Sequence, residues 1–289
     1  MAPFAEAPEI EKWKDGVLTE PIGEFRMRQK SWDTPRIDLR KEALLRKADN
    51  QVTRARLLAS AQPESGSWIE VIPVPNLGTH LTPEELRIAI ALRTGSRICE
   101  EHRCKCGKIV DKHGYHLLSC YFNVGRLPRH AAINDIIFRA LSSAGMVSEL
   151  EPEGLNQNDG TRPDGITRFP FSRGRPLCWD ATCVDTFAET SVPQNAIQAG
   201  SAAANAEKAK VRKYSNLARR FKFEPIAIET LGVFGPTTKI IIQEIGRRIA
   251  EKTGDEREVM WLKQRLNIAV QRGNAASILS QAKHMTGFA

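Results

Sequence analysis

The stretch GTRPDGITRFPFSRGRPLCWDATCVD, residues 160–185, carries two aspartates in very different settings. Asp164 lies in the broken segment RPDG, whereas Asp180 lies inside the apolar run LCWDATCV. Glycine and proline divide the stretch into two strand candidates, TRPDGITRF and PLCWDATCVD. An ionised aspartate in an apolar strand is tolerated only where it is paired or binds a metal. The stretch therefore predicts a strand pair that carries a polar site.

Hydrophobic periodicity and Gly/Pro breaks around this stretch predict the remaining elements. In chain order they are helices at about 32–61, 81–95 and 128–145, a strand at 146–150, the two strands above, a helix at about 192–220, a strand at 224–232, and helices at 236–254 and 255–283. Thr82 is the expected N-cap of the second helix, with Pro83 in its first turn and Gly95 at its end. The order predicts an α/β fold with a mixed sheet flanked by helices, extended by helices at both ends.

A cysteine-rich segment, CKCGKIVDKHGYHLLSC at 104–120, precedes the helix at 128–145. Cys104 and Cys106 offer two thiolates on a tight loop, and His116 and Cys120 follow one helical turn apart, a set that suits tetrahedral zinc. In a reducing compartment this composition favours a metal over disulfides. Cys99, His102 and His113 are nearby alternatives for one ligand, and buried thiols without a metal are the alternative for the whole segment. Four protein ligands would make the zinc structural.

The charge of the chain favours a polyanionic partner. Forty-two Lys and Arg against 34 Asp and Glu give a net charge of +8. Residues 207–222 carry seven basic side chains with two aromatic residues between them, which is typical of a surface that follows a phosphate backbone. An ordinary solvated helix face is the alternative. No apolar run is long enough to span a membrane, and the acidic N-terminus does not read as a signal peptide, so an intracellular protein is expected.

Asp164, at the tip of one strand, and Asp180, on the next strand, could share a divalent cation. Mg²⁺ takes oxygen ligands and binds through one or two carboxylates together with substrate phosphates. Such an ion, Mg²⁺ or Mn²⁺, activates water for phosphodiester hydrolysis and stabilises the leaving oxygen. Without a metal, the two carboxylates would repel and at least one pKa would rise.

The order RPDG, spacer, acid in an apolar strand, within helix, three strands, helix, strand, resembles the PD-(D/E)xK restriction-like nuclease core. Residues 54–273 look more closely like the C-terminal region of non-LTR retrotransposon polyproteins that carry such an endonuclease. The similarity rests on CKCG, DKHGYHLLSC, GRLPRHAAIND, DGTRPDG, WDATCVD and KVRKY. It implies a metal-dependent DNA endonuclease following a zinc knuckle, with DNA, or RNA, as partner.

The resemblance assigns roles to individual residues. It implies Asp164 and Asp180 as metal ligands, with Glu149 or Glu151 assisting. Thr182 occupies the place of the usual lysine, and a lysine on the following helix, Lys210, is expected to substitute. The expected nucleic-acid contacts, some from the resemblance and some from the basic segment, are Arg129, His130, Lys208, Lys213, Arg219 and Arg220. Arg129 and His130 belong with Asn134 to a pattern RHxxxN, for which a structural role is the alternative.

The expected organisation has four parts: a helical region at 1–97, a CCHC zinc knuckle at 98–124, a nuclease core at 125–232 and C-terminal helices at 233–289. No paired aspartates of a reverse transcriptase occur, so such an enzyme, as a domain or a separate chain, is an expected partner. A nuclear location follows from the resemblance alone. Three functions remain open from the sequence: a DNA-nicking enzyme, a catalytically inactive nucleic-acid binder, and a structural or partner-binding protein.

Overall fold

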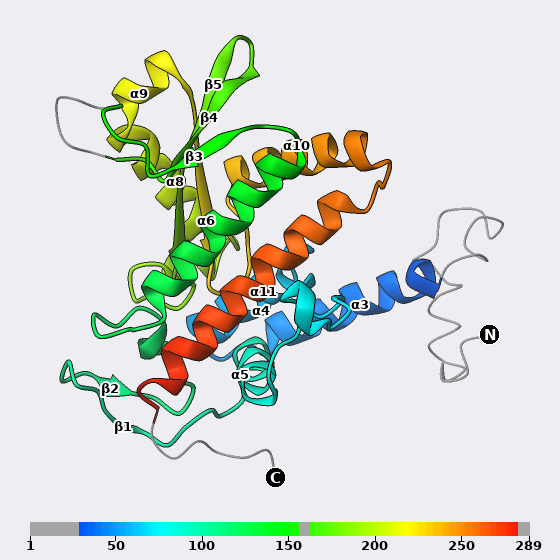
Figure 1. Ribbon diagram of the computed structural model, residues 1–289. Coiled ribbons are helices and arrows are strands. Elements are labelled where there is room, and N and C mark those ends of the chain that lie inside the picture. The colour runs from blue at the N-terminus through cyan, green and yellow to red at the C-terminus, as the bar shows by residue number, and fades with distance from the viewer. Residues whose placement is uncertain (1–28, 156–161, 283–289) are drawn as a thin grey trace. The chain divides into compact units, whose positions relative to one another are not determined.

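The computed structural model describes residues 29–155 and 162–282 (Figure 1). The chain divides into two compact units, residues 1–49 and 50–289, and the first contains helix α3 (Gln29–Arg46). Helix α4 (Gln51–Ser60) starts the second unit, where the Asn50 side chain accepts a hydrogen bond from Thr53 N at 2.8 Å. The expectation of one continuous helix over 32–61 was therefore wrong, because this N-cap starts a new helix.

The second unit contains the candidate site and a four-stranded sheet of order β3-β4-β5-β6. Its strands are β3 (Ser148–Leu150), β4 (Gly165–Ser172), β5 (Arg175–Val184) and β6 (Lys222–Glu229). The first three are antiparallel neighbours, and β6 is parallel to β5. A parallel neighbour requires a crossover, which is helical here as expected. The predicted α/β class with a mixed sheet flanked by helices is confirmed.

The crossover is not one long helix over 192–220. It consists of α7 (Val192–Asn195), α8 (Ser201–Lys213) and α9 (Ser215–Arg220). Gly200 has φ +85°, a left-handed conformation that ends the loop after α7, and Tyr214 ends α8 before α9 starts. The breaks matter for function because they set the position of the basic residues of α8 and α9.

The two faces of the sheet carry different helices (Figure 1). Helices α6 (Arg126–Ser143), α10 (Pro236–Thr253) and α11 (Glu258–Leu279) cover the face that carries Trp179 and Ala181. The opposite face meets α8 and α9, where Cys178 packs with Tyr214 and Leu217. This alternation along β5 follows from the two-residue period of a strand. It also puts Asp180 on the same face as α8.

Helix α5 (Pro83–Thr94) and the cysteine-rich segment join the same unit. Thr82 and Glu85 form a reciprocal capping box, and Gly95 ends the helix at φ +76°, as predicted. The cysteine-rich segment forms β1 (His102–Arg103), β2 (Ile109–Val110) and the short helix η3 (Tyr115–Leu118); the short helices η1 (Glu64–Gly66) and η2 (Pro75–Leu77) precede it. In the described part of the chain, no helix combines the length and apolar character of a membrane span.

One hydrophobic cluster draws on all four expected parts of the chain. It includes Ile88, Leu117, Leu231 and Ile278, all nearly inaccessible to solvent. The expected boundaries at 97/98, 124/125 and 232/233 therefore fall inside a single compact unit, whose observed boundary is at 49/50. The cysteine-rich segment shares its core with α5 and α11.

Glu229 anchors the start of α8, the helix that carries Lys210. This residue ends β6, is fully buried, and accepts hydrogen bonds from Thr186 Oγ1 at 3.1 Å and Ala203 N at 3.3 Å. Burial raises the pKa of Glu229 to about 7, although these hydrogen bonds oppose the rise. The N-terminus of α8 also favours a negative charge there.

We expect Glu229 to make the protein less stable at pH 8 than at pH 5. Between its ordinary pKa of 4.5 and about 7, only the folded state holds the proton, so stability falls as pH rises and levels off above pH 7. The full change is about 3 kcal/mol. Urea unfolding of the wild type and Glu229→Gln at both pH values checks this. The variant should have a smaller pH dependence; equal dependence in both proteins would contradict the assignment.

Candidate functional site

A cluster of three thiols and one imidazole lies in the cysteine-rich segment. Cys106 Sγ is 3.1 Å from His116 Nε2, and Cys104 Sγ is 3.5 Å from Cys120 Sγ. One ligand atom from each residue lies within 4.8 Å of the other three. Among the described residues, this is the one group of at least three His, Cys, Asp or Glu side chains with such spacing. The cluster could hold a metal ion.

Tight turns bring these side chains together. The turn after Cys104 closes with hydrogen bonds from Gly107 N to Cys104 O and from Cys104 N to Lys108 O, both 2.9 Å. Gly107 has φ +87°, which a side chain would disfavour. One residue between two cysteines is therefore sufficient, because the glycine lets the chain reverse immediately after Cys106.

The three alternative ligands have other partners. Cys99 is fully buried, with its thiol 3.6 Å from Asp111 O. His102 contacts two carbonyl oxygens, those of Glu100 at 2.8 Å and Gln281 at 3.1 Å. His113 Nδ1 contacts Ser96 O at 3.2 Å. The structure therefore gathers the four residues that the sequence favoured and leaves the alternatives out of the cluster.

Asp164 lies directly before β4 and is bonded to the residues on either side of Asp180 in β5. Asp164 N donates to Trp179 O at 3.0 Å, and Asp164 Oδ2 accepts a hydrogen bond from Ala181 N at 2.6 Å. These bonds hold the Asp164 carboxylate against the residue that follows Asp180. Asp164 Oδ2 also contacts His130 Nε2 of α6 at 3.0 Å. The acid of the RPDG segment is thus bonded to the neighbouring strand and to α6.

Asp180 is buried, with 4% of its side chain exposed. Tyr214 OH donates to its Oδ1 at 2.6 Å, and Lys210 Nζ forms an ion pair with its Oδ2. Oδ2 has no hydrogen bond of ordinary geometry, so Lys210 is its sole described polar partner. Lys213 Nζ in turn donates to Tyr214 OH at 3.1 Å. Helix α8 and the residue that ends it therefore supply both partners of this carboxylate.

The electrostatics keep Asp164 ionised. Burial alone would raise the pKa of Asp164, but the hydrogen bond and positive charge of His130 and the Ala181 N–H lower it below its ordinary value. The hydrogen bond to Asp164 raises the pKa of His130, although burial opposes this. Burial and the nearby Asp180 raise the pKa of Tyr214, so its hydroxyl stays protonated and acts as a donor. Lys210 and His130 therefore offset the charge of the two carboxylates.

Trp179 supports the pair from the opposite face of the sheet. Its indole is fully buried and donates to Asn134 Oδ1 at 3.1 Å, while Asn134 Nδ2 lies 3.4 Å from the His130 ring. A Cβ atom at Gly165 would collide with this indole. The RHxxxN pattern thus has a structural use here: Asn134 links Trp179 to the histidine that contacts Asp164. Trp179 is a core residue.

Two expected site residues lie apart from the pair. Glu149 of β3 forms an ion pair with Arg168 at 2.6 Å, and among the described residues it has no contact with either aspartate. Arg129 is 3% exposed and donates to Asn274 Oδ1 of α11 at 2.7 Å. This burial leaves its guanidinium unavailable to nucleic acid, so its placement does not fit the expected phosphate contact. Glu151, the alternative to Glu149, has a backbone N–H that donates to Asp164 O at 2.8 Å.

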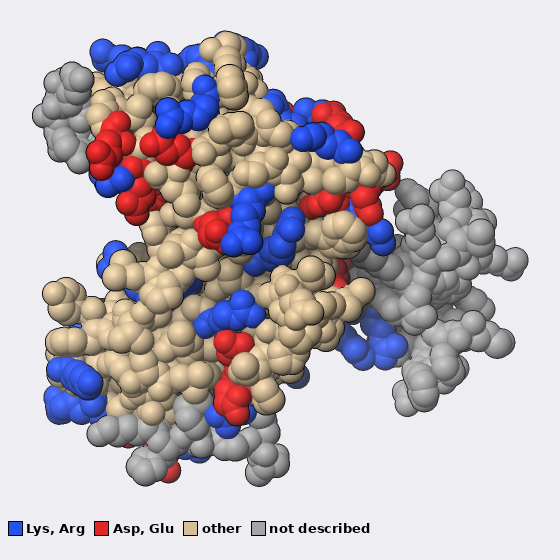
Figure 2. All heavy atoms as spheres, viewed as in Figure 1, with Lys and Arg blue, Asp and Glu red and all other residues tan. Residues whose placement is uncertain are grey.

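The other expected nucleic-acid contacts are exposed on α8 and α9. They are Lys208, Lys213, Arg219 and Arg220. Figure 2 shows Lys and Arg side chains gathered at the end of the molecule that carries α9 and the β4–β5 hairpin. His130, also expected to contact nucleic acid, points to Asp164 instead but keeps 40% of its side chain exposed.

Sequence reasoning missed the direct role of Tyr214, which it placed only beside the candidate lysine. The signal was available: Lys210 and Tyr214 are four residues apart, a spacing that puts two side chains on one helix face. Both contact Asp180.

No protein-family model matches the chain, and comparison with curated proteins gives no match either.

Proposed function

We propose that this chain is a metal-dependent DNA endonuclease whose site is built from Asp164, Asp180 and Lys210. The observation that carries the proposal is the ion pair between Lys210 of α8 and the buried Asp180, beside a second ionised carboxylate on the adjacent strand. Two carboxylates beside a lysine suit phosphodiester hydrolysis with a divalent cation, because the carboxylates can bind the ion and the ammonium can offset charge on the phosphate. Thr182 lies two residues after Asp180 on β5, where the nuclease core that the sequence resembles usually has a lysine. That position is therefore uncharged in this chain.

The carboxylates fit Mg²⁺ or Mn²⁺. Asp180 Oδ2 is buried and accepts no well-formed hydrogen bond, and the Asp164 pKa is low, so both acids are suited to a hard cation with oxygen ligands. Asp164 and Asp180 would hold the ion, which when bound lowers the pKa of water and polarises the scissile phosphate.

The side chains around the two carboxylates would position the reacting groups and offset their charge. Lys210 would orient the attacking water or offset charge on the phosphate. Tyr214 holds the Asp180 carboxylate in place with its 2.6 Å hydrogen bond. His130, 3.0 Å from Asp164, would hold that carboxylate and add positive charge at the exposed side of the site.

The Cys104, Cys106, His116 and Cys120 cluster would hold a structural zinc ion. Ligand atoms about 2.3 Å from a tetrahedral ion lie about 3.8 Å from one another. This separation falls between the shortest observed contacts, 3.1 and 3.5 Å, and the upper limit of 4.8 Å within the cluster. All four positions would be filled by protein, so this ion would stabilise the knuckle rather than take part in hydrolysis.

Nicking of a supercoiled plasmid by the purified protein tests the function. The expected result is conversion to the open circle with Mg²⁺ or Mn²⁺ and none with EDTA. Failure to nick with either metal, at several salt concentrations and temperatures, would overturn the proposal.

A catalytically inactive nucleic-acid binder is the second candidate. The observation that favours it is that His130 and Lys210 pair with the two carboxylates. The negative charge of the acids is then balanced without a metal ion. Salt-sensitive DNA binding without metal-dependent nicking would identify this function.

Replacing Lys210 should reduce nicking on the order of 100-fold, because Lys210→Met removes the charge beside the reacting phosphate. Lys252→Met, at an exposed position of α10, removes the same charge elsewhere and should have little effect. Thr182 lies on the same sheet face as Asp180, so Thr182→Lys in the Lys210→Met background should restore part of the activity. Single-turnover nicking rates of the four proteins measure this; full activity in Lys210→Met would contradict the assigned role.

A further inference from the structure

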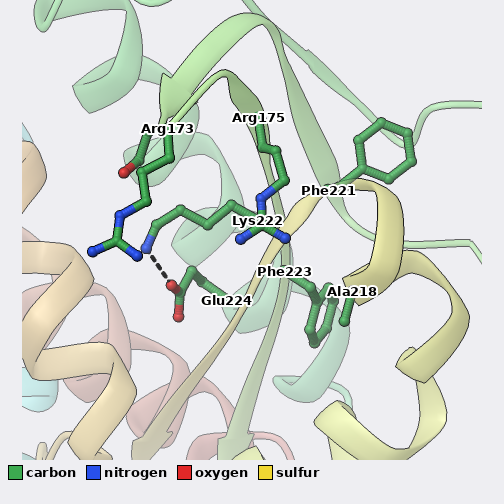
Figure 3. A pocket seen from close by; sticks show the side chains of 8 residues that line it. Arg173, Arg175, Ala218, Phe221, Lys222, Phe223 and Glu224 are labelled. Carbon is green, nitrogen blue, oxygen red and sulfur yellow. Dashed lines mark hydrogen bonds and ion pairs between the residues drawn. The ribbon is translucent and has the colours of Figure 1, made fainter.

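A polar hollow of about 350 Å³ lies between the tip of the β4–β5 hairpin and the start of β6 (Figure 3). Arg173 and Arg175 reach into it from the hairpin, and Lys222 and Glu224 from β6. None of these four residues belongs to the acid pair or to the metal cluster. The hollow lies at the end of the molecule where Figure 2 shows Lys and Arg side chains together.

The charges in the hollow favour an anion. Lys222 and Glu224 form an ion pair with each other, as the dashed line in Figure 3 marks. Arg173 and Arg175 have no carboxylate partner among the described residues. Two exposed guanidiniums with free donors, next to a locally neutral pair, form a site of net positive charge. Guanidinium groups match the geometry of phosphate oxygens, so a phosphate is the anion that the hollow suits.

The backbone at Arg173 supports a role for its side chain. Ser172 pairs with Arg175, so Arg173 and Gly174 form a two-residue hairpin turn, with φ of +49° and +73°. Asparagine and glycine are favoured in such turns because they tolerate positive φ. An arginine in this conformation is strained, and strained residues of this kind concentrate at functional sites.

The hollow lies at the hairpin end of the sheet, away from the acid pair. Arg175 and Asp180 are five residues apart on β5, or about 17 Å at 3.3 Å per residue. This separation is odd, so their side chains leave opposite faces of the sheet, and Lys222 and Glu224 of β6 share the face of Arg175. A DNA substrate bound at Asp180 would therefore reach the hollow where its backbone passes around the hairpin end of the sheet.

We propose that Arg173 and Arg175 bind a phosphate of the DNA backbone away from the acid pair, with Lys222 and Glu224 shaping the hollow. This inference rests on the proposed endonuclease function and extends it to a second contact with the substrate. The contact is to the backbone and therefore contributes to affinity for any sequence.

The test compares Arg173→Asn/Arg175→Gln with wild type and with a matched control, Lys252→Gln/Arg265→Gln, which loses the same charge at exposed positions of α10 and α11. Binding to a fluorescent 30-base-pair duplex is measured by anisotropy across a salt series, and plasmid nicking is measured in parallel. The hairpin variant should bind about tenfold more weakly at low salt, with its log K against log salt slope reduced by about 1. Its KM for nicking should rise while kcat stays unchanged.

Folding of the hairpin variant is checked by its thermal midpoint. Asparagine relieves the positive φ at position 173, so the variant should unfold at the same or a higher temperature than wild type. Weaker binding in a protein of equal or greater stability is a result that a merely structural arginine would not give.

The outcomes separate the two proposals. If the wild-type protein neither nicks DNA nor binds it in a salt-dependent way, both the endonuclease and the phosphate site are contradicted. Wild type that nicks, with a hairpin variant whose salt slope and KM match those of the control, overturns the phosphate site alone. Equal losses in the hairpin variant and the control also overturn it, because the effect would then be one of net charge.

Discussion

Asp164→Asn and Asp180→Asn should each lower the rate of metal-dependent DNA nicking on the order of 10³-fold, because each removes a charged ligand of the proposed Mg²⁺ site. Asparagine keeps the shape of the side chain and an oxygen acceptor. In Asp164→Asn that oxygen can still accept the hydrogen bond from Ala181 N. The effect is therefore expected on activity rather than on folding. Plasmid nicking over a range of Mg²⁺ concentrations measures it.

DNA binding should persist in both variants, because the loss of a negative charge near the phosphate backbone weakens no attraction. Asp135→Asn is a matched control, since Asp135 is an exposed acid of α6 that pairs with Arg139 at 2.8 Å. The control should nick at the wild-type rate. Nicking that survives in the Asp164→Asn/Asp180→Asn double variant would show that the reaction takes place elsewhere in the protein.

Loss of the metal at the Cys3His cluster should have the largest effect on stability. Structural zinc contributes on the order of 10 kcal/mol to the folding of small zinc domains. Here Cys104 and Cys120 are buried and lie in the same hydrophobic cluster as α5 and α11. Unfolding of the cysteine-rich segment would therefore expose part of the core of the unit. We expect Cys104→Ser to lower the thermal midpoint on the order of 10–20 °C.

Elemental analysis should find one zinc per wild-type chain and much less in Cys104→Ser. A zinc chelator should lower the midpoint of the wild type toward that of the variant. Cys183→Ala provides the control, because Cys183 lies in β5 outside the cluster. It should keep the zinc. A wild type that contains no zinc and whose midpoint does not respond to the chelator would contradict the proposed metal site.

Local signals in the sequence were sufficient for most elements. The N-cap at Thr82 and the strand that carries Asp180 depend on neighbours along the chain, and both appear in the structure as expected. Two of the expected helices, 32–61 and 192–220, were predicted less well, because Asn50 and Tyr214 start or end helices inside these periodic stretches. Hydrophobic periodicity does not reveal such breaks, because the apolar face continues on both sides of them.

In the candidate site, too, local spacing was sufficient for some predictions and packing decided the others. The spacing of Cys104, Cys106, His116 and Cys120 was sufficient to predict which residues gather, because ligands on tight turns are close through local chain geometry. Arg129 and His130 are neighbours in sequence, yet one is buried against α11 and the other reaches Asp164. Adjacent residues on a helix point about 100° apart, and only the packing of α6 decides what each direction meets.

Periodicity and short spacings along the chain were sufficient for the α/β order of elements, the acid in an apolar strand and the cluster of three cysteines and one histidine. The tertiary structure alone decided that Lys210 and Tyr214 contact Asp180 and that Glu149 faces Arg168. Those contacts join residues that are 19 to 34 positions apart, as subtraction of their numbers shows. Lys210 and Tyr214 meet Asp180 only when the crossover through α8 folds back onto the sheet, and Glu149 meets Arg168 only when β3 pairs with β4. Side-chain direction in one element carries no information about the register of the next.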